Sequence, residues 1–197
     1  DRLIIGGDLN DGDWAVNGNI VVGGNRFGPT RYLTNGNVFR NVRPVTFDAS
    51  GNVPNDGSGT SFDSLHDDLL ATSATLGACA DRGVVQKDAS LPYQADFVGN
   101  DPEFNIFNVS STQWSRSSSS INITAPSGST VVINIHGPSV AITNCGMLLN
   151  GVDLEHVIYN YVDATELRTT NFAHLGSVLA PQAIAHFVAG SIDGCAV

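Results

Sequence analysis

The chain has few charged residues, and the shortage is greatest among the basic ones. Asp, Glu, Lys and Arg make up 14% of its 197 residues, against about 25% in an average soluble domain. The chain has only 9 Lys and Arg but 19 Asp and Glu, so the formal net charge is −10 at pH 7. Nucleic acids and anionic membranes are bound by surfaces where Lys and Arg are concentrated. The sequence therefore predicts that the chain binds neither.

Long hydrophobic runs are also missing. No apolar stretch approaches the roughly 20 residues that span a bilayer, so we expect no membrane insertion. The chain begins Asp1-Arg2-Leu3, with neither Met nor a signal-peptide pattern. This start indicates a mature or trimmed terminus.

Cysteine is scarce and is not spaced as in metal sites. The three cysteines are Cys79, Cys145 and Cys195. One disulfide, for which Cys145 and Cys195 are the candidate pair, would fit an oxidising compartment, whereas three buried thiols acting as small hydrophobic side chains is the alternative. The triplets Asn-Val-Ser at Asn108 and Asn-Ile-Thr at Asn122 match the N-glycosylation pattern, so these two residues are candidate glycosylation sites.

What the chain does contain is 42% hydrophobic residues, 21 Gly, and many Ser, Thr and Asn. This mixture is typical of a β-rich fold with many tight turns. The first third repeats: Ile4-Ile5-Gly6-Gly7-Asp8-Leu9 is echoed by Val21-Val22-Gly23-Gly24-Asn25, and Asn17-Gly18-Asn19 by Asn35-Gly36-Asn37. An offset of about 17–18 residues is typical of a solenoid, in which each coil lays one strand beside the last.

One segment has helical periodicity. The spacing predicts a helix from Ser61 to roughly Ala80, with one apolar face formed by Phe62, Leu65, Leu69 and Leu76. Thr60 and Asp63 have the spacing of a capping box at its start, and Gly77 and Gly83 bracket its expected end. An amphipathic helix needs an apolar surface to cover, and the flank of a solenoid provides one.

The second half predicts short strands separated by polar turns. They are Phe104–Val109, Ile121–Thr124, Val131–Ile135, Val140–Thr143, Val157–Tyr161, Gly176–Ala180 and Ala185–Val188. Residues 48–59 and 81–99 are expected to be irregular, and Ser115–Ser120 is expected to be an exposed turn. Alternation within Val131–Ile135 predicts side chains on two opposite faces. Strands and helices do not alternate, so a doubly wound α/β sheet is excluded.

Five blocks of the sequence, in this order, resemble the choice-of-anchor A domain family. They are Val16–Asn25, Phe104–Val109, Ala125–Ile135, Val157–Tyr161 followed by Asp163-Ala164-Thr165, and Gly176–Pro181. The resemblance covers nearly the whole chain. It implies a secreted or surface-displayed, adhesin-like module, sometimes labelled collagen-binding, and it implies no catalytic residues. The chain differs from the family's bacterial members in its longer loops and in ending at Cys195-Ala196-Val197 without an anchor.

The block Gly176-Ser177-Val178-Leu179-Ala180-Pro181 and the order strand, helix, strand also resemble the β-solenoid of microbial ice-binding proteins. That likeness implies a solenoid with a helix along it, but a shared fold does not by itself transfer an activity. The surface lacks a steady Thr-x-Thr ladder, which an ice-binding face commonly has.

Acidic residues gather in two places: Asp8, Asn10, Asp11 and Asp13, and then Asn100, Asp101 and Glu103. The first group does not follow the calcium loop pattern, since Gly12 stands where a ligand should be. We expect exposed turns at both, with calcium left as an alternative. The five histidines show no zinc spacing, although His174 and His186 could meet across adjacent coils.

No motif predicts catalysis. A Gly-x-Ser-x-Gly nucleophile elbow is absent, and neither Asp67/Asp68 nor Asp101/Glu103 shows the pattern of a glycosidase cleft. We therefore predict no catalytic, cofactor-binding or metal site.

The sequence as a whole predicts a mostly β fold: a β-solenoid (β-helix) with one amphipathic helix packed alongside, forming a single domain over residues 1–197. The predicted function is a non-catalytic structural or adhesion module, located extracellularly or at the cell surface. Its partners would be an extracellular protein or glycan, or other copies of itself. The alternatives are an ice-binding protein and a polysaccharide-cleaving β-helix enzyme.

Overall fold

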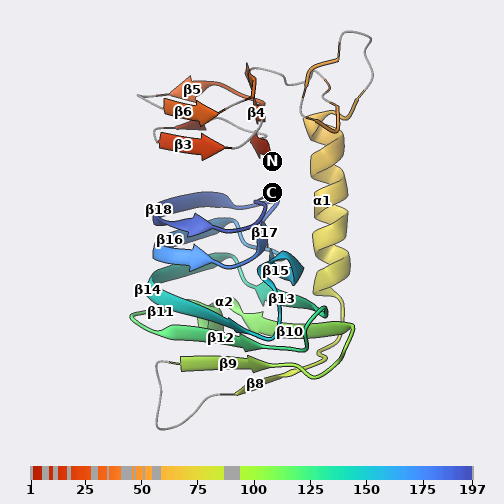
Figure 1. Cartoon of the computed structure of the whole chain (residues 1–197), viewed down its shortest axis with the longest axis vertical. Coiled ribbons are helices and arrows are strands. Elements are labelled where there is room, and N and C mark those ends of the chain that lie inside the picture. The colour runs from red at the N-terminus through yellow and green to blue at the C-terminus, as the bar shows by residue number, and fades with distance from the viewer. Residues whose placement is uncertain are drawn as a thin grey trace. The chain divides into compact units, whose positions relative to one another are not determined.

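The computed structural model describes residues 2–5, 9–10, 13–16, 19–27, 31–34, 36–40, 46, 48–50, 52–54, 59–86 and 94–196. The chain forms two compact units (Figure 1): unit 1 comprises Asp1–Leu69 and Val197, and unit 2 comprises Leu70–Ala196. Strands dominate both units, so the prediction of a mostly β chain is confirmed.

Unit 1 contains three small parallel sheets. Their strands are β1 (Arg2–Ile5), β4 (Asn19–Val22) and β7 (Val38–Arg40); β2 (Leu9–Asn10) and β5 (Arg26–Phe27); and β3 (Asp13–Val16) and β6 (Arg31–Thr34). Arg2 lies opposite Asn19, and Ile20 lies opposite Val38, so paired strands are 17 or 18 residues apart. This offset confirms the repeat seen in the sequence. Of the tripeptides that carried it, Asn17, Gly18 and Asn35 lie outside the described residues.

The predicted helix is confirmed as α1 (Phe62–Gly77), although its N-terminal cap differs from the prediction. The backbone N–H of Ser64 donates to Ser61 Oγ at 3.1 Å, so Ser61 is the capping residue and not Thr60. In unit 1, Phe62 packs against Val21 in a small buried cluster. The helix ends at Gly77, where any Cβ would lie 2.8 Å from Val162 Cγ1.

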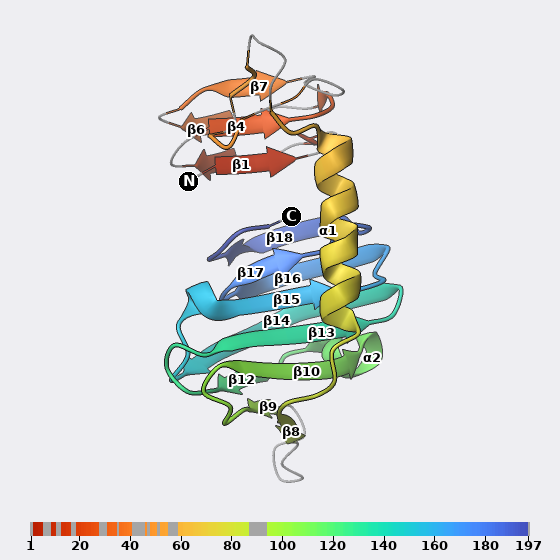
Figure 2. The same cartoon turned by 90° about the vertical axis from the view of Figure 1, so that its right-hand side faces the viewer.

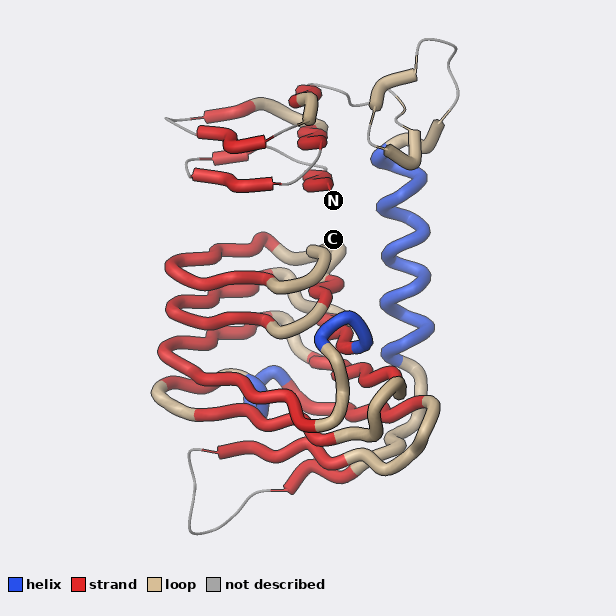
Figure 3. Tube along the Cα trace, in the orientation of Figure 1, coloured by secondary structure: helices blue, strands red, loops and turns tan. Residues whose placement is uncertain are grey.

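Unit 2 contains two sheets, and the chain passes from one to the other as it winds (Figures 1 and 3). The long sheet has the order β18-β16-β14-β12-β9-β8, and the second sheet has the order β10-β13-β15-β17. The long-sheet strands are β8 (Val84–Gln86), β9 (Gln94–Val98), β12 (Ser120–Thr124), β14 (Ser139–Asn150), β16 (Glu166–His174) and β18 (Ile184–Ile192), with β11 (Arg116–Ser117) pairing beside β14. The second-sheet strands are β10 (Phe104–Ser110), β13 (Thr130–His136), β15 (Val157–Tyr161) and β17 (Ser177–Leu179).

Successive strands of unit 2 pair in parallel with a nearly constant offset. Phe104 lies opposite Thr130, and Ser139 lies opposite Glu166, so the offset is 26 or 27 residues through most of the unit. It shortens to 18 where Glu166 pairs with Ile184. The described pairing departs from parallel between β8 and β9, which run antiparallel.

The seven strands predicted in this half all exist, but the sequence missed several elements. The 81–99 segment contains β8 and β9, and Ser115–Ser120, expected to be a turn, contains β11 and the start of β12. Strand β16 was not predicted. Two short helices, α2 (Ser111–Trp114) and the 3-10 turn η1 (Leu154–His156), were also not predicted.

The interior of unit 2 is one apolar cluster between the two sheets. Val131, Ile133 and Ile135 of β13 all point into it and are fully buried. The alternating residues Val132 and Asn134 are buried as well, at 2% and 0% exposure. Both faces of β13 are therefore buried, because α1 covers the outer face of the second sheet (Figure 2).

A ladder of asparagines, which we call the Asn ladder, attaches the helix to this outer face. It consists of Asn108, Asn134 and Asn160, which are 26 residues apart on three neighbouring strands. Asn134 Nδ2 donates to Asn108 Oδ1 at 3.1 Å, and Asn160 Nδ2 donates to Asn134 Oδ1 at 2.8 Å. The same three amides donate to the carbonyls of Cys79, Leu76 and Ser73 at 3.0, 2.8 and 2.9 Å. The three rungs thus tie the second sheet to carbonyls in the last turns of α1 and just beyond its end.

The corners of the coils also stack. Ser118, Asn144, Asn171 and Ala189 all have φ close to +50°. Asn171 Nδ2 donates to Asn144 Oδ1 at 2.7 Å across a separation of 27 residues. Left-handed backbone at this corner lets each coil turn while keeping its strands in register.

Candidate binding face

The outer face of the long sheet is the part of unit 2 where side chains point away from the apolar interior. Along β12 and β14, Ile121, Ile123, Val140 and Ile142 point inward and are fully buried. Their neighbours alternate outward and are half-buried or exposed. Strand register lines up these outward side chains in rows that cross the sheet.

The part of this outer face that is uppermost in Figure 1, which we call the upper part, lies on β14, β16 and β18. Its three rows are Ser139, Glu166 and Ile184; Ala141, Arg168 and His186; and Thr143, Thr170 and Val188. Arg168 Nη2 lies 2.6 Å from Glu166 Oε1, with both side chains well exposed. An exposed ion pair of this kind adds at most about 1 kcal/mol to stability, so the pair mainly neutralises the two charges on the face.

The lower part of the outer face lies on β9, β12 and β14. Gln94 and Asn122 both donate to Asp96 Oδ1, at 2.8 and 2.7 Å, and hold its carboxylate in place. The row continues from Asp96 and Asn122 to Leu148, whose side chain is 53% exposed. Beside them Ser120 pairs with Gly146, at which an added Cβ would meet no atom within 4 Å.

The two candidate glycosylation sites lie in different settings. Asn108 belongs to the Asn ladder, and its amide nitrogen donates to both Cys79 O and Asp81 Oδ1. Asn122 is half-buried on the outer face and donates one hydrogen bond, to Asp96. A glycan on Asn108 would break contacts that hold α1, whereas one on Asn122 would stand on the outer face. Modification of either residue stays a prediction.

The three thiols are free, and the candidate pair Cys145 and Cys195 is not joined. Cys145 is buried, with Sγ 3.3 Å from the Thr143 carbonyl, whereas Cys195 is exposed and Cys79 is half-buried. A disulfide between Cys145 and Cys195 stays a prediction.

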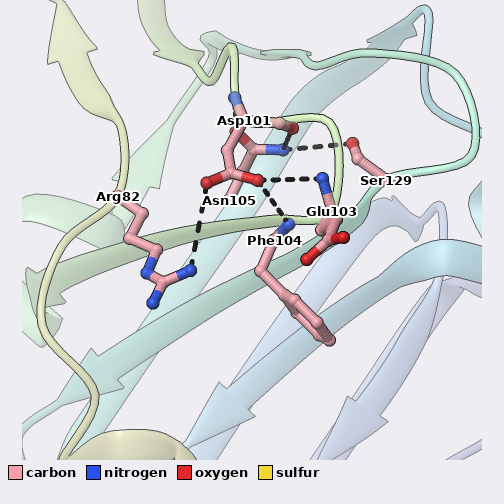
Figure 4. Close-up of polar contacts among 6 residues, drawn as sticks. All are labelled: Arg82, Asp101, Glu103, Phe104, Asn105 and Ser129. Atoms are coloured by element: carbon pink, nitrogen blue, oxygen red, sulfur yellow. Dashed lines mark hydrogen bonds and ion pairs between the residues drawn. The ribbon is translucent and has the colours of Figure 1, made fainter.

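Of the two acidic groups, the second is a closed turn (Figure 4). Asp101 Oδ1 accepts the backbone N–H groups of Glu103 and Phe104 at 2.8 and 3.1 Å. These two bonds lower the pKa of Asp101 below its ordinary value. The buried Asn105 donates to Asp101 O and Ser129 Oγ, and Arg82 lies 3.9 Å from the carboxylate. The carboxylate therefore stabilises its own turn, as the sequence predicted.

In the first acidic group, Asn10 and Asp13 lie in β2 and β3, while Asp8 and Asp11 lie outside the described residues. Within the part of the chain that the structure describes, no group of three or more His, Cys, Asp or Glu could hold a metal ion.

The histidines do not come together. His186 lies opposite Arg168 on the outer face, whereas His174 is fully buried on the inner side of β16. The idea that they meet across adjacent coils is wrong, because they belong to opposite faces of the sheet. Burial lowers the pKa of His174 to about 3, so its ring is neutral.

Sequence reasoning missed a buried polar chain that contains this histidine. Trp114 Nε1 donates to Tyr161 Oη at 3.2 Å, and Tyr161 Oη lies 2.9 Å from His174 Nε2. The three side chains come from α2, β15 and β16, with Tyr161 and His174 13 residues apart and Trp114 and Tyr161 47 residues apart. The 26-residue offset would have revealed the Asn ladder, but it does not reveal this grouping.

The family comparison bears on this geometry. A family model described as "Putative Ice-binding-like adhesive domain" matches residues 1–197. The chain belongs to the ice-binding-like adhesive domain family. The searches of curated proteins and of solved structures found no match.

Membership in the ice-binding-like adhesive domain family shows an adhesion-type module and agrees with the more distant of the two resemblances seen in the sequence. The match does not show the choice-of-anchor A family. The ice-binding-like adhesive domain family is not an enzyme family. Among the described helices, none is both long and apolar enough to cross a membrane.

Proposed function

We propose that the chain is an extracellular or surface-displayed adhesion module that binds its partner through the outer face of the long sheet. We also propose that residues 1–197 make a single family domain and that unit 2 is a β-solenoid. The partner would be an extracellular protein or glycan, and no catalysis is involved.

One observation carries the choice of surface. The second sheet has its outer face occupied by α1, through the Asn ladder, whereas the outer face of the long sheet carries rows of exposed and half-buried side chains in register. A rigid sheet of this kind presents many contact points without first having to order its side chains, which lowers the entropic cost of binding.

The solenoid proposal rests on three regular features of unit 2. Strands pair in parallel at offsets of 26 or 27 residues, left-handed corner residues recur at Ser118, Asn144 and Asn171, and asparagine side chains stack at matching positions. Each feature is expected when successive coils stack on one another.

An arginine placed on the outer face tests the proposal. Ala141 is exposed in the middle of β14, and Ala74 is exposed on α1. We expect A141R to reduce adhesion of the purified chain to arrays of extracellular-matrix proteins and glycans at least tenfold, because the long cation prevents close contact. The matched variant A74R should adhere like the wild type. Equal adhesion of the two variants would show that this face is not the binding surface.

Ice binding is a second candidate, favoured by one row of the same face. Ser117, Thr143 and Thr170 lie in register on adjacent strands, and an ice-binding face needs such repeated hydroxyl groups. The Glu166–Arg168 ion pair lies on the same face and interrupts the pattern. Faceting of ice crystals by the micromolar protein, lost in T143R, would support this candidate, and unchanged ice growth would remove it.

The polysaccharide-cleaving alternative is less well supported. Glycoside hydrolysis needs one carboxyl group with a raised pKa as the general acid, whereas two backbone N–H groups lower the pKa of Asp101. Self-association also stays a prediction. At the lower edge of the long sheet, the short antiparallel strand β8 disfavours pairing with another copy.

A further inference from the structure

We infer that the lower part of the outer face, around Gly146, binds one ring of a neutral saccharide. The inference rests on the proposed function and narrows it to a ligand class and to a place on β9, β12 and β14. It starts from Gly146, a position at which neither the backbone conformation nor the packing requires a glycine.

Gly146 differs from every other glycine of unit 2. Gly128, Gly137, Gly151 and Gly176 have φ between +79° and +142°, which favours glycine. A Cβ at Gly77, Gly83, Gly99, Gly190 or Gly194 would lie under 3.0 Å from a neighbouring atom. Neither reason applies to Gly146: its φ is not positive, and a Cβ there would meet open space.

A glycine in the middle of a strand weakens the strand, and it often marks a place where a ligand approaches the backbone. Gly146 lies in β14 and points outward, opposite the outward Ser120 of β12. We call this position the notch, because Gly146 is exposed and no other residue except its chain neighbours comes within 4 Å of where its Cβ would lie. A flat ring could rest there against the peptide backbone.

The polar groups beside the notch suit hydroxyl groups. Asp96 is held by two amides, so its carboxylate is already oriented to accept hydrogen bonds. The amide oxygens of Gln94 and Asn122 accept no hydrogen bond from any described residue, and Ser120 adds a hydroxyl next to Gly146. A cluster of oriented acceptors matches adjacent sugar hydroxyls, each of which can donate one hydrogen bond.

An apolar side chain lies beside the notch. Among the described residues, the rows that contain Gly146 and Leu148 hold no Lys or Arg. Leu148 follows Gly146 on the same side of β14 and is 53% exposed, so it can cover the carbon face of a sugar ring. The charge of Asp96 would repel a carboxylated or sulfated sugar. We therefore assign the site to neutral saccharides rather than to uronic, sialic or sulfated ones.

Two substitutions test the inference, using an array of neutral manno-, gluco- and galacto-oligosaccharides beside uronic and sulfated ones. We expect the wild type to bind a neutral member and G146V to bind it at least tenfold more weakly, because the new side chain fills the notch. The thermal midpoint of G146V should not fall, since valine favours strands. The conservative D96N should also bind more weakly. The control A74V, at the exposed Ala74 of α1 and outside the outer face, should bind like the wild type.

The outcomes separate this inference from the proposed function. Loss of binding in G146V but not in A74V supports the site. Binding of acidic sugars alone, no sugar binding, or equal loss in both variants overturns it. If A141R lost adhesion while G146V kept it, the outer face would still be the adhesive surface and only the saccharide site would be wrong.

Discussion

His174 lies inside unit 2 among aromatic rings, with the ring of Phe172 at 4.6 Å and that of Tyr159 at 5.4 Å between centroids. Tyr161 Oη accepts a hydrogen bond from Trp114, so its own proton is directed to His174 Nε2. This arrangement places the imidazole proton on Nδ1, which is buried without a partner among the described residues. The Nδ1–H therefore has no acceptor among the described residues, and burial disfavours the charged form of the ring.

We predict that acid destabilises the fold through His174. Its pKa is about 3 when folded, against 6.5 ordinarily, so the unfolded chain binds the proton more tightly. Above pH 6.5 the ring is neutral in both states, so the free energy of unfolding does not depend on it. As the pH falls from 6.5 toward 3, protonation of the unfolded chain lowers the free energy of unfolding by about 1.4 kcal/mol per pH unit. The nearby groups Tyr159 and Tyr161 stay neutral, because burial raises the pKa of each.

Urea unfolding at pH 7.5 and pH 4.5 measures this effect. H174Q cannot titrate but can still bond to Tyr161, so its stability should change less between the two pH values than that of the wild type. Equal pH dependence in both proteins would assign the acid sensitivity to other groups.

Ala189 is the one corner residue with no polar side chain, and its φ is +50°. The left-handed conformation costs an alanine roughly 1–2 kcal/mol, whereas Asn and Gly tolerate it. We therefore expect A189N and A189G each to stabilise the protein by about 0.5–1 kcal/mol, measured as a higher thermal midpoint. A185N, an exposed change on the same strand without positive φ, should not. If A189N lowered the midpoint, the stacked-corner argument would fail.

At the scale of elements, the helix and the second sheet depend on each other. Asn134 bonds to Leu76 O, Asn108 and Asn160, and it is fully buried. Replacing it with Ala leaves those groups without partners, at about 1–3 kcal/mol for a buried group. We expect N134A to lower stability by about 2–3 kcal/mol and to speed amide exchange at the C-terminal end of α1.

N150A serves as the control, because Asn150 is exposed and, among the described residues, its side chain makes one long hydrogen bond, 3.5 Å to Thr124 Oγ1. It should change stability by less than about 0.5 kcal/mol. Slow exchange along α1 in N134A would mean that apolar packing alone attaches the helix.

Elements with a simple hydrophobic pattern were predictable, and the others were not. The helix follows from the spacing of Phe62, Leu65 and Leu69, and β13 follows from a run of Val and Ile. Strand β16 was missed because Thr169 and His174 point inward, so its pattern contains polar residues at core positions. Strand β9 was missed because Ala95 and Phe97 give only two inward apolar residues.

The candidate face could be predicted only in part. The sequence shows that Asp96, Asn122 and Leu148 alternate with apolar residues, but not that they share one row. That grouping depends on the register, which the offset of 26 residues sets and which the 17–18-residue repeat of the first third does not reveal. The notch at Gly146 could not be predicted either, since the other nine glycines of unit 2 have a steric or conformational role and the sequence does not distinguish them from Gly146.

At the scale of the whole molecule, apolar packing and hydrogen-bonded ladders hold unit 2 together, and its three cysteines are unpaired in the structure. We predict that a reducing agent leaves the thermal midpoint unchanged. Under native conditions iodoacetamide should modify Cys195 rapidly and the buried Cys145 only on unfolding, as mass spectrometry would show. Protection of both thiols, reversed by reduction, would instead reveal the disulfide suggested by the sequence.

The corner stack of Ser118, Asn144, Asn171 and Ala189 restricts how relatives of this protein can change in length. The steps between these residues are 26, 27 and 18, so the last coil is shorter than the others while the corner is kept. Insertions and deletions should therefore fall between corners, within loops. A single residue added inside β14 or β16 would turn every later side chain of that strand to the opposite face. Positions where homologues differ in length should therefore lie in the loops between the corners, and the corners themselves should keep their places.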